Sequence, residues 1–203
     1  MGKPRRVGRP RAASREILEE AACELFLERG YAATSVADIT QRAGVSRATF
    51  FNYVPTKSDL LWTSVDDAVD ALEAELRGAD GEGGEAGAVA EVRAALLRVG
   101  AALEPGTVVL AFANAEPMGV AEELEESAAR RQGRAGAVIA GHLRRRGVES
   151  LPADVLGTAV AGAFLAALRY WSRAPVPREP FPDALCRALD VLTVTAGDGR
   201  PRG

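Results

Sequence analysis

A run of polar side chains between residues 46 and 53 could make hydrogen bonds along one face of a short helix. Arg47 has the length and the donors to bind guanine O6 and N7 or a phosphate. The small Ala48 would let the backbone approach closely or contact a thymine methyl group. The other hydrogen-bonding candidates in this run are Ser46, Thr49, Asn52 and Tyr53. This chemistry suits the edges of DNA bases, and the alternative is a structural three-helix core with incidental polar residues.

Phosphate contacts are predicted on both sides of that run. Thr34 and Ser35 stand where a helix over residues 36–43 should begin, and Lys57 stands near the start of another helix. The first turn of a helix attracts anions, because its N–H groups have no partner and its dipole is positive there. We therefore expect these three side chains near a sugar-phosphate backbone.

Basic residues gather at the N-terminal end of the chain. The chain has 25 basic and 28 acidic residues, which gives a net charge of −3. Residues 1–60 nevertheless hold ten basic and seven acidic residues, whereas residues 61–203 hold fifteen and twenty-one. The first fifteen residues contain no acid and six basic side chains, which are Lys3, Arg5, Arg6, Arg9, Arg11 and Arg15. A basic arm on an acidic protein predicts contact with a polyanion, although a solvated tail has the same composition.

Apolar spacing, with glycine and proline as punctuation, predicts an all-α chain of about nine helices. The first three are expected at residues 14–29, 36–43 and 47–53, with Ser14 capping the first. Gly44 stands in the tight turn between the second and the third, where a positive φ is needed. A glycine-rich acidic loop is expected over residues 78–88, and the later helices at 56–77, 88–103, 106–114, 117–146, 152–173 and 180–196.

Two short helices joined by such a turn have the geometry of a helix-turn-helix, whose second helix enters the DNA major groove. The run from Arg15 to Trp62 moreover resembles the DNA-binding domain of TetR-family transcriptional regulators. The Gly-Arg-Pro-Arg sequence at residues 8–11 is also frequent in that family. The other shared positions are Phe26, Gly30, Tyr31, Thr34, Ser35, Val36, Ile39, Ala43, Gly44, Val45, Ser46, Phe50, Phe51, Tyr53, Pro55, Lys57 and Leu60.

The resemblance implies a dimeric, cytoplasmic bacterial repressor that a small-molecule ligand releases from a double-stranded DNA operator. It divides the chain into a flexible basic arm over residues 1–13, a helix-turn-helix DNA-binding domain over 14–60 and a ligand-binding and dimerisation domain over 61–203. Family members often have a tyrosine at the position of Phe51, and its hydroxyl binds a phosphate. Phe51 is therefore expected in the DNA interface, but it cannot donate that hydrogen bond. The run "TFFNYVPTKSDLLW" is similar to a narrower group, the regulators of mycofactocin gene clusters that respond to acyl-CoA.

The C-terminal part offers candidates for a subunit interface and for a ligand pocket. The helix over 152–173 is rich in glycine and alanine, which let helices approach closely. With the helix over 180–196 it is predicted to form a four-helix interface with a second copy, and packing within one chain is the alternative. The pocket is expected among the fourth to seventh helices, lined by Trp62, Phe112, Met118 and His142. Each of these could instead pack in the core, and His142 could lie at a solvated helix end.

Few residues are available for catalysis or for metal binding. His142 is the single histidine, and Cys23 and Cys186 lie far apart on predicted helices. No catalytic set, metal site or cofactor is therefore expected, which disfavours an enzyme. No segment approaches about eighteen apolar residues without a charge, so no membrane span is expected. A helical ligand-binding module without DNA binding is the remaining alternative, and the ligand, the operator and the direction of regulation stay open.

Overall fold

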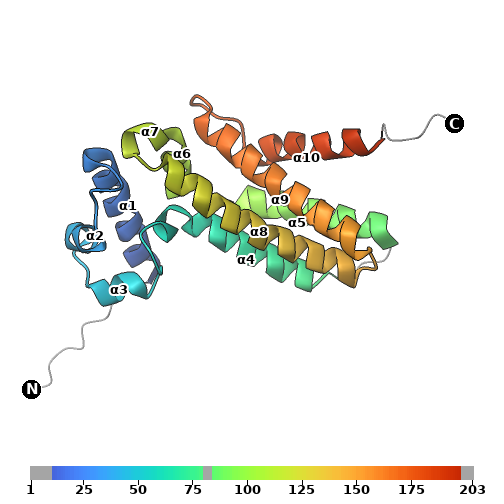
Figure 1. Ribbon diagram of the computed structural model, residues 1–203, viewed down its shortest axis with the longest axis horizontal. Helices are drawn as coiled ribbons and strands as arrows, with labels where there is room; N and C mark the ends of the chain where they lie inside the picture. The colour runs from blue at the N-terminus through green and yellow to red at the C-terminus, as the bar shows by residue number, and fades with distance from the viewer. Residues whose placement is uncertain (1–10, 80–83, 198–203) are drawn as a thin grey trace, which may run out of the picture.

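The computed structural model describes residues 11–79 and 84–197 of the chain, and over these residues the protein is helical without strands. The all-α prediction is confirmed (Figure 1). The helices in chain order are α1 (Arg11–Arg29), α2 (Val36–Ala43), α3 (Arg47–Phe51), the 3-10 helix η1 (Asp59–Leu61), α4 (Thr63–Arg77), α5 (Gly84–Ala102), α6 (Thr107–Ala113), α7 (Ala115–Met118), α8 (Ala121–Arg145), α9 (Ser150–Arg173) and α10 (Phe181–Gly197).

The head of the molecule is formed by α1, α2 and α3, which pack around one small apolar core. Leu25 and Phe26 of α1, Ile39 of α2 and Phe50 of α3 are all 0% exposed. Burying a side chain of this size contributes about 1.5–3 kcal/mol. The three short helices therefore hold one another in place, and the side chains on their outer faces are left for other contacts.

Two boundaries in the head differ from the sequence prediction. Helix α1 begins at Arg11, so Arg11 to Ala13 are helical and Ser14 is not its cap, whereas residues 1–10 of the predicted arm lie outside the described residues. Helix α3 ends at Phe51, and Asn52 and Tyr53 form the turn that follows. The Asn52 N–H still bonds back to the Ala48 carbonyl at 3.1 Å, so this turn continues the helical path.

The predicted helix over 56–77 is divided into η1 and α4. The break falls at Trp62, whose φ of −116° and ψ of 4° are not helical. Trp62 is 0% exposed, and its indole Nε1 donates to Ser127 Oγ of α8 at 2.7 Å. This long-range bond fixes the chain where the head joins the rest of the protein.

The bundle behind the head consists of α4, α5, α8, α9 and α10 (Figure 1). Helices α8 and α9 approach so closely that a Cβ atom on Gly157 would lie 2.5 Å from the Gly136 carbonyl oxygen. Part of the small-residue stripe predicted for a subunit interface thus packs within one chain. Helix α5 begins at Gly84, which shortens the predicted 78–88 loop, and residues 80–83 lie outside the described residues.

The predicted helix over 117–146 is also divided, so the described chain has ten α-helices rather than about nine. Gly119 has a φ of 62°, a left-handed conformation that ends α7 before α8 begins at Ala121. Pro117 lies inside α7 rather than at the start of the long helix. Helix α7 in turn touches the head, because the Tyr31 N–H donates to the Met118 carbonyl at 2.7 Å.

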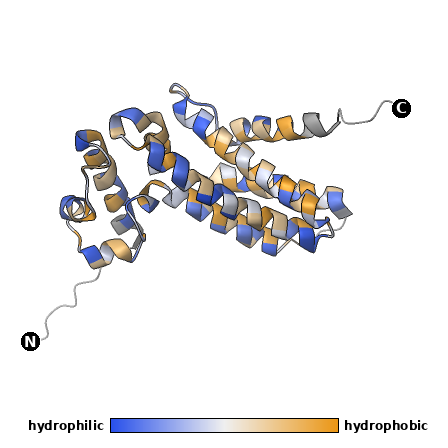
Figure 2. Cartoon of the chain, viewed as in Figure 1, coloured by the Kyte–Doolittle hydropathy of each residue, from blue (hydrophilic) through white to orange (hydrophobic). Residues whose placement is uncertain are grey.

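Helix α9 is the one described helix with the length and composition of a membrane-crossing segment, and its most apolar window has a mean hydropathy of 1.7. Hydrophobic residues occur along the length of this helix, as Figure 2 shows. Phe164, Leu165, Leu168 and Trp171 are all at most 7% exposed between α8 and α10. This packing is that of the central helix of a helical bundle.

Candidate nucleic-acid interface

The two short helices of the head, α2 and α3, are bounded by three capping residues, and two of these lie in the turn between the helices. Ser35 caps the start of α2 through a reciprocal pair, because its Oγ accepts from the Asp38 N–H and its own N–H donates to the Asp38 carboxylate. Gly44 has a φ of 64°, which confirms the positive φ predicted for this turn. Ser46 Oγ accepts from the Thr49 N–H at 3.0 Å and caps α3. Gly44 and Ser46 together define the turn between α2 and α3.

The outer face of α3 carries most of the predicted base-reading residues. Arg47, Ala48 and Asn52 are exposed, and Phe51 is 51% exposed. Thr49 and Tyr53 are half-buried. Phe50 is 0% exposed and points into the head core, with its ring meeting that of Phe51 at a centroid distance of 5.2 Å. The fold therefore turns one side of α3 inward and presents the polar side outward, as a recognition helix requires.

The basic side chains of the head differ in whether their charge is already paired. Arg42 of α2 is held by Glu24 and Glu28 of α1 at 2.8 and 2.7 Å, and its hydrogen bond lowers the pKa of Glu28. Arg29 lies 3.5 Å from Asp38. Among the residues that the structure describes, Arg47 has no hydrogen-bond or ion-pair partner. Its guanidinium remains available to a base edge or a phosphate.

Thr34 and Lys57 have contacts within the protein at the positions predicted for phosphate. Thr34 is 1% exposed, and its Oγ1 donates to the Gly30 carbonyl at 2.8 Å. Lys57 Nζ donates to the carbonyls of Tyr31 and Thr34 at 2.7 and 2.9 Å and lies 3.9 Å from the Tyr31 ring centroid. Burial lowers the pKa of Lys57. Both side chains hold the loop before α2, and Ser35 is the exposed member of the predicted trio.

An ionic cluster joins η1 and α4 to α8 directly behind the head. Arg131 of α8 is 7% exposed and donates to Asp59 at 2.9 Å and to both carboxylate oxygens of Asp66, at 2.9 and 2.8 Å. Its guanidinium also lies over the Trp62 ring, 5.0 Å from the centroid. Burial acts to raise the pKa of Asp59, but hydrogen bonds from Thr56 and Arg131 outweigh it and lower that pKa. Arg131 could not be found from the sequence, because neither periodicity nor local spacing pairs residue 131 with residues 59 and 66.

The four predicted ligand-binding residues lie in two separate places in the structure. Trp62 and Phe112 are 0% and 2% exposed and meet edge to face, with centroids 5.6 Å apart. Met118 is also 0% exposed. His142 instead contacts Leu76, fourteen residues further along α4 from Trp62, a separation of about 21 Å at 1.5 Å per helical residue. Trp62 and His142 therefore lie at opposite ends of α4.

His142 is buried rather than at a solvated helix end. The side chain is 1% exposed, with Nδ1 3.0 Å from the Leu76 carbonyl oxygen and Nε2 3.0 Å from the Glu91 carboxylate. Arg146 lies 3.2 Å from the same carboxylate. This cluster joins the C-terminal ends of α4 and α8 to α5.

The two cysteines are separate in the structure, as their predicted helices imply, and both are free thiols. Burial raises the pKa of the Cys23 thiol to about 12. Cys186 accepts a hydrogen bond from Arg93 Nη2 at 3.0 Å. Within residues 11–79 and 84–197, no group of three or more His, Cys, Asp or Glu side chains could hold a metal ion.

Comparisons with known proteins match the geometry of the head. Residues 18–62 match the family model described as bacterial regulatory proteins, tetR family. MftR of Mycobacterium tuberculosis, a regulator whose name places it with mycofactocin biosynthesis, is 39% identical over 57 residues, 28% of this chain and 29% of that protein. The HTH-type transcriptional regulator EthR of Mycobacterium tuberculosis is 39% identical over 74 residues, 36% of this chain and 34% of that protein. The matched segment spans about a third of the length of these curated relatives.

A solved structure extends the similarity to the bundle. FadR of Thermus thermophilus, a TetR-family transcriptional repressor solved in complex with lauroyl-CoA, is 27% identical to this chain. The alignment covers 88% of this chain and 93% of that one, with a TM-score of 0.53. The head and the bundle therefore occur together in the same arrangement in a protein of known structure.

Proposed function

We propose that this chain, which belongs to the tetR family of bacterial regulatory proteins through its N-terminal region, is a DNA-binding transcriptional repressor that acts as a homodimer. The observation that carries the proposal is the outer face of α3. Arg47, which has no partner among the described residues, and the small Ala48 lie on a helix that is anchored through Phe50, and Asn52 follows directly after it. The proposal includes the predicted boundary near residue 60 between the DNA-binding domain and the ligand-binding and dimerisation domain. This boundary falls inside η1.

The DNA contacts follow from the positions of the side chains on and around α3. Arg47, Ala48 and Thr49 occupy its first turn, the part of a recognition helix that meets base edges. Asn52 and Tyr53 extend this face, and Ser35 lies at the start of α2. Ser46 and Phe51 border the interface. We assign Thr34 and Lys57 to positioning these elements, because their hydrogen bonds are made within the protein.

A second copy is proposed to pack on α9 and α10. Helix α9 has an exposed stripe at helical spacing that includes Leu151, Val155, Ala166 and Tyr170, and Leu151, Val155 and Tyr170 are 74%, 58% and 61% exposed. Val191 of α10 is 61% exposed. Exposed apolar residues aligned on one helix face favour association, and two-fold symmetry would place two α3 helices about one DNA turn apart.

Release from DNA by a small-molecule ligand completes the proposal. FadR was solved with lauroyl-CoA, and 93% of its chain aligns with this one, which supports a ligand-responsive bundle here. We propose that Trp62, Phe112 and Met118 transmit the response rather than bind the ligand, because all three are buried where the bundle meets the head. We assign His142 to the far end of the same connecting helix.

The proposed setting is the bacterial cytoplasm, and the proposed role is regulation without a cofactor or a catalytic step. The thiol of Cys23 is buried with a raised pKa, which makes it a poor nucleophile. Both ring nitrogens of the single histidine, His142, lie within hydrogen-bond distance of protein groups, the Leu76 carbonyl and the Glu91 carboxylate. These contacts favour a structural role for both residues.

The test is binding to the DNA upstream of the protein's own gene, measured by fluorescence anisotropy at two salt concentrations. We expect binding that weakens with salt, and a loss of at least about tenfold for Arg47→Ala/Tyr53→Ala. Arg130→Ala removes an exposed arginine from α8 and is the matched control. Equal affinity of the double variant and the wild type would refute reading by α3.

A further inference from the structure

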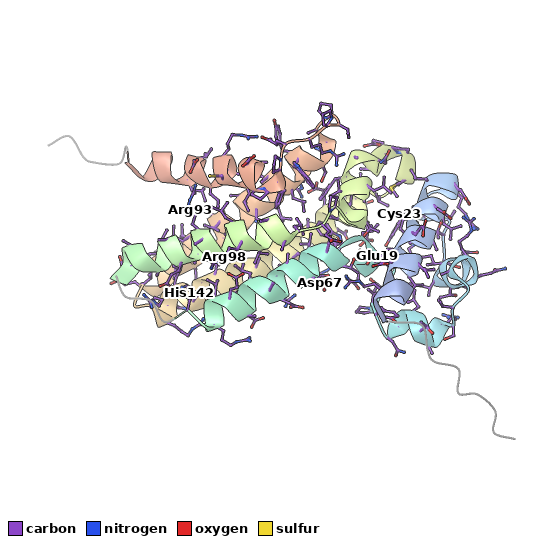
Figure 3. All side chains as sticks on the ribbon, turned by 180° about the vertical axis from the view of Figure 1, so that it is seen from behind. Glu19, Cys23, Asp67, Arg93, Arg98 and His142 are labelled. Carbon is purple, nitrogen blue, oxygen red and sulfur yellow. The ribbon has the colours of Figure 1, made fainter. Side chains whose placement is uncertain are left out.

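A groove runs along the junction between the head and the bundle, on the side seen in Figure 3. We call it the junction groove. Its walls come from α1, α4, α5 and the segment between α5 and α6, and its volume is about 590 Å³. Pockets that hold small organic ligands range from about 300 to 1,000 Å³. The junction groove is thus large enough for a drug-sized molecule.

The charged residues that line the groove are predominantly acidic. Five carboxylates face it, those of Glu16, Glu19, Asp67, Glu75 and Glu104, together with two guanidinium groups, those of Arg15 and Arg98. The formal charge of the lining is therefore −3. Low-dielectric walls strengthen the attraction of such a groove for a cation.

The two arginines are already held by carboxylates of the groove. Arg15 lies 3.4 Å from Glu19 and 2.7 Å from Asp67. Arg98 Nε donates to Glu75 at 2.9 Å. Within the described part of the chain, Glu16 and Glu104 have no ion-pair partner. Two of the three net negative charges thus lie on Glu16 and Glu104, and the third is shared by Glu19 and Asp67, which have only Arg15 between them.

The rest of the lining is apolar, with one unused hydrogen-bonding group. Ala68 and Ala71 of α4 face Val99 and Leu103 across the groove. Ser64 also lines it, and its Oγ is buried without a hydrogen-bond partner in the structure. Such a surface offers contact area to an apolar body.

We propose that the junction groove binds an organic cation with an apolar body, such as a lipophilic ammonium or phosphonium compound. The carboxylates of Glu16 and Glu104 would neutralise the positive charge, and the alanine, valine and leucine side chains would cover the body. A bare metal ion fits less well, because the described carboxylates do not converge into a metal-binding group. An anion would meet uncompensated negative charge.

Because α1 belongs to the head and α4 and α5 to the bundle, an occupant of the groove touches both parts. Any change in head orientation alters the groove, so cation affinity and DNA affinity are coupled. That coupling rests on the proposed DNA-binding function, whereas binding of the cation itself does not. The test therefore measures cation binding without DNA.

The probes are tetraphenylphosphonium and tetraphenylborate, two ions of the same shape and opposite charge, titrated into the full-length protein by calorimetry. We expect the cation to bind and the anion to bind at least about tenfold more weakly. Equal affinities would show that only apolar contacts are made and would overturn the proposal. Absence of binding by the cation would overturn it as well.

Two variants place the binding in the groove. Glu16→Gln/Glu104→Gln should weaken tetraphenylphosphonium binding about tenfold and leave the thermal unfolding temperature unchanged, because neither side chain has a described ion-pair partner. Glu122→Gln/Glu126→Gln changes the same charge at exposed positions of α8 and should bind as the wild type does. Ala71→Trp should fill the groove and block the probe. Unchanged affinity in both groove variants would refute the assignment.

Discussion

Arg131 of α8 and Asp66 of α4 form a two-pronged ion pair, with Nε and Nη2 donating to the two carboxylate oxygens at 2.9 and 2.8 Å. The Arg131 side chain is 8% exposed, whereas that of Asp66 is 33% exposed. Burial raises the pKa of Asp66 even though hydrogen bonds from Arg131 act to lower it. The pair holds the helix that leaves the head against the longest helix of the bundle.

Arg131→Met should therefore lower the free energy of unfolding by about 3 kcal/mol, because two partly buried carboxylates lose their shared cation. Arg144→Met is the control, since Arg144 pairs with Asp154 where both side chains are exposed, and it should cost less than about 1 kcal/mol. Urea unfolding measures both values. Similar losses of unfolding free energy for the two variants would show that the Arg131 ion pairs stabilise the protein no more than an exposed ion pair does.

Two glycines in open surroundings should respond to alanine with opposite signs. A Cβ atom at Gly44 or at Gly133 would meet nothing within 4 Å, but Gly44 has a φ of 64° and Gly133 lies inside α8. Gly44→Ala should destabilise the protein by about 1 kcal/mol, because the left-handed conformation crowds Cβ. Gly133→Ala should stabilise it by roughly 0.5–1 kcal/mol, because alanine restricts the unfolded chain. Thermal unfolding of both variants checks the contrast, and a shared sign would contradict it.

The helix boundaries that could be predicted are those marked by local residues. Ser35, Gly44 and Ser46 sit at the ends of α2 and α3 in the sequence as they do in the structure. The break at Trp62 could not be predicted, because apolar spacing continues through it and the interruption comes with the indole bond to Ser127. Helix caps can be predicted from local sequence, whereas a helix break that comes with a contact to a distant residue can be located only in the folded structure.

The candidate site shows the same limit. The exposed face of α3 follows from helical periodicity around Phe50, so its residues could be predicted. The position of Lys57 suggested a phosphate contact, and only the fold brings the carbonyls of Tyr31 and Thr34 to its ammonium group. The large separation of His142 from Trp62 along α4 likewise depends on which helices pack together.

Glu19 should make the stability of the protein depend on pH. Burial raises its carboxyl pKa above 4.5, so its contribution to stability is present below pH 4.5 and is lost as pH rises through the folded pKa. Glu19→Gln keeps an acceptor for the Thr63 hydroxyl, which lies 2.6 Å away, and removes this titration. The unfolding free energy of the variant relative to wild type should therefore increase from pH 4 to pH 7.

Urea unfolding at pH 4 and pH 7 gives that difference. Glu20→Gln removes a carboxylate from the exposed side of α1 and is the matched control. The change seen in Glu20→Gln is subtracted first. If the unfolding free energy of Glu19→Gln relative to wild type then falls from pH 4 to pH 7, the pKa of Glu19 is not raised by folding.

The proposed subunit interface should fail when charge is placed on the α9 stripe. Val155→Glu/Ala166→Glu puts two carboxylates on a face that is exposed in one chain, so folding should be retained and the dimer should dissociate. Light scattering after size exclusion should report a monomer for this variant. Leu27→Glu, at a side chain of α1 that is 46% exposed, is the control and should stay dimeric. A dimeric stripe variant would place the interface elsewhere.

Selection of duplexes from a random library with the purified protein shows whether two copies of α3 read a DNA sequence. We expect enrichment of an inverted repeat whose half-sites lie about 10–10.5 base pairs apart, or a multiple of that spacing. Arg47→Ala/Tyr53→Ala should lose this enrichment. A selection that returns no repeated sequence, or the same repeat with the double variant, would refute sequence reading by paired α3 helices.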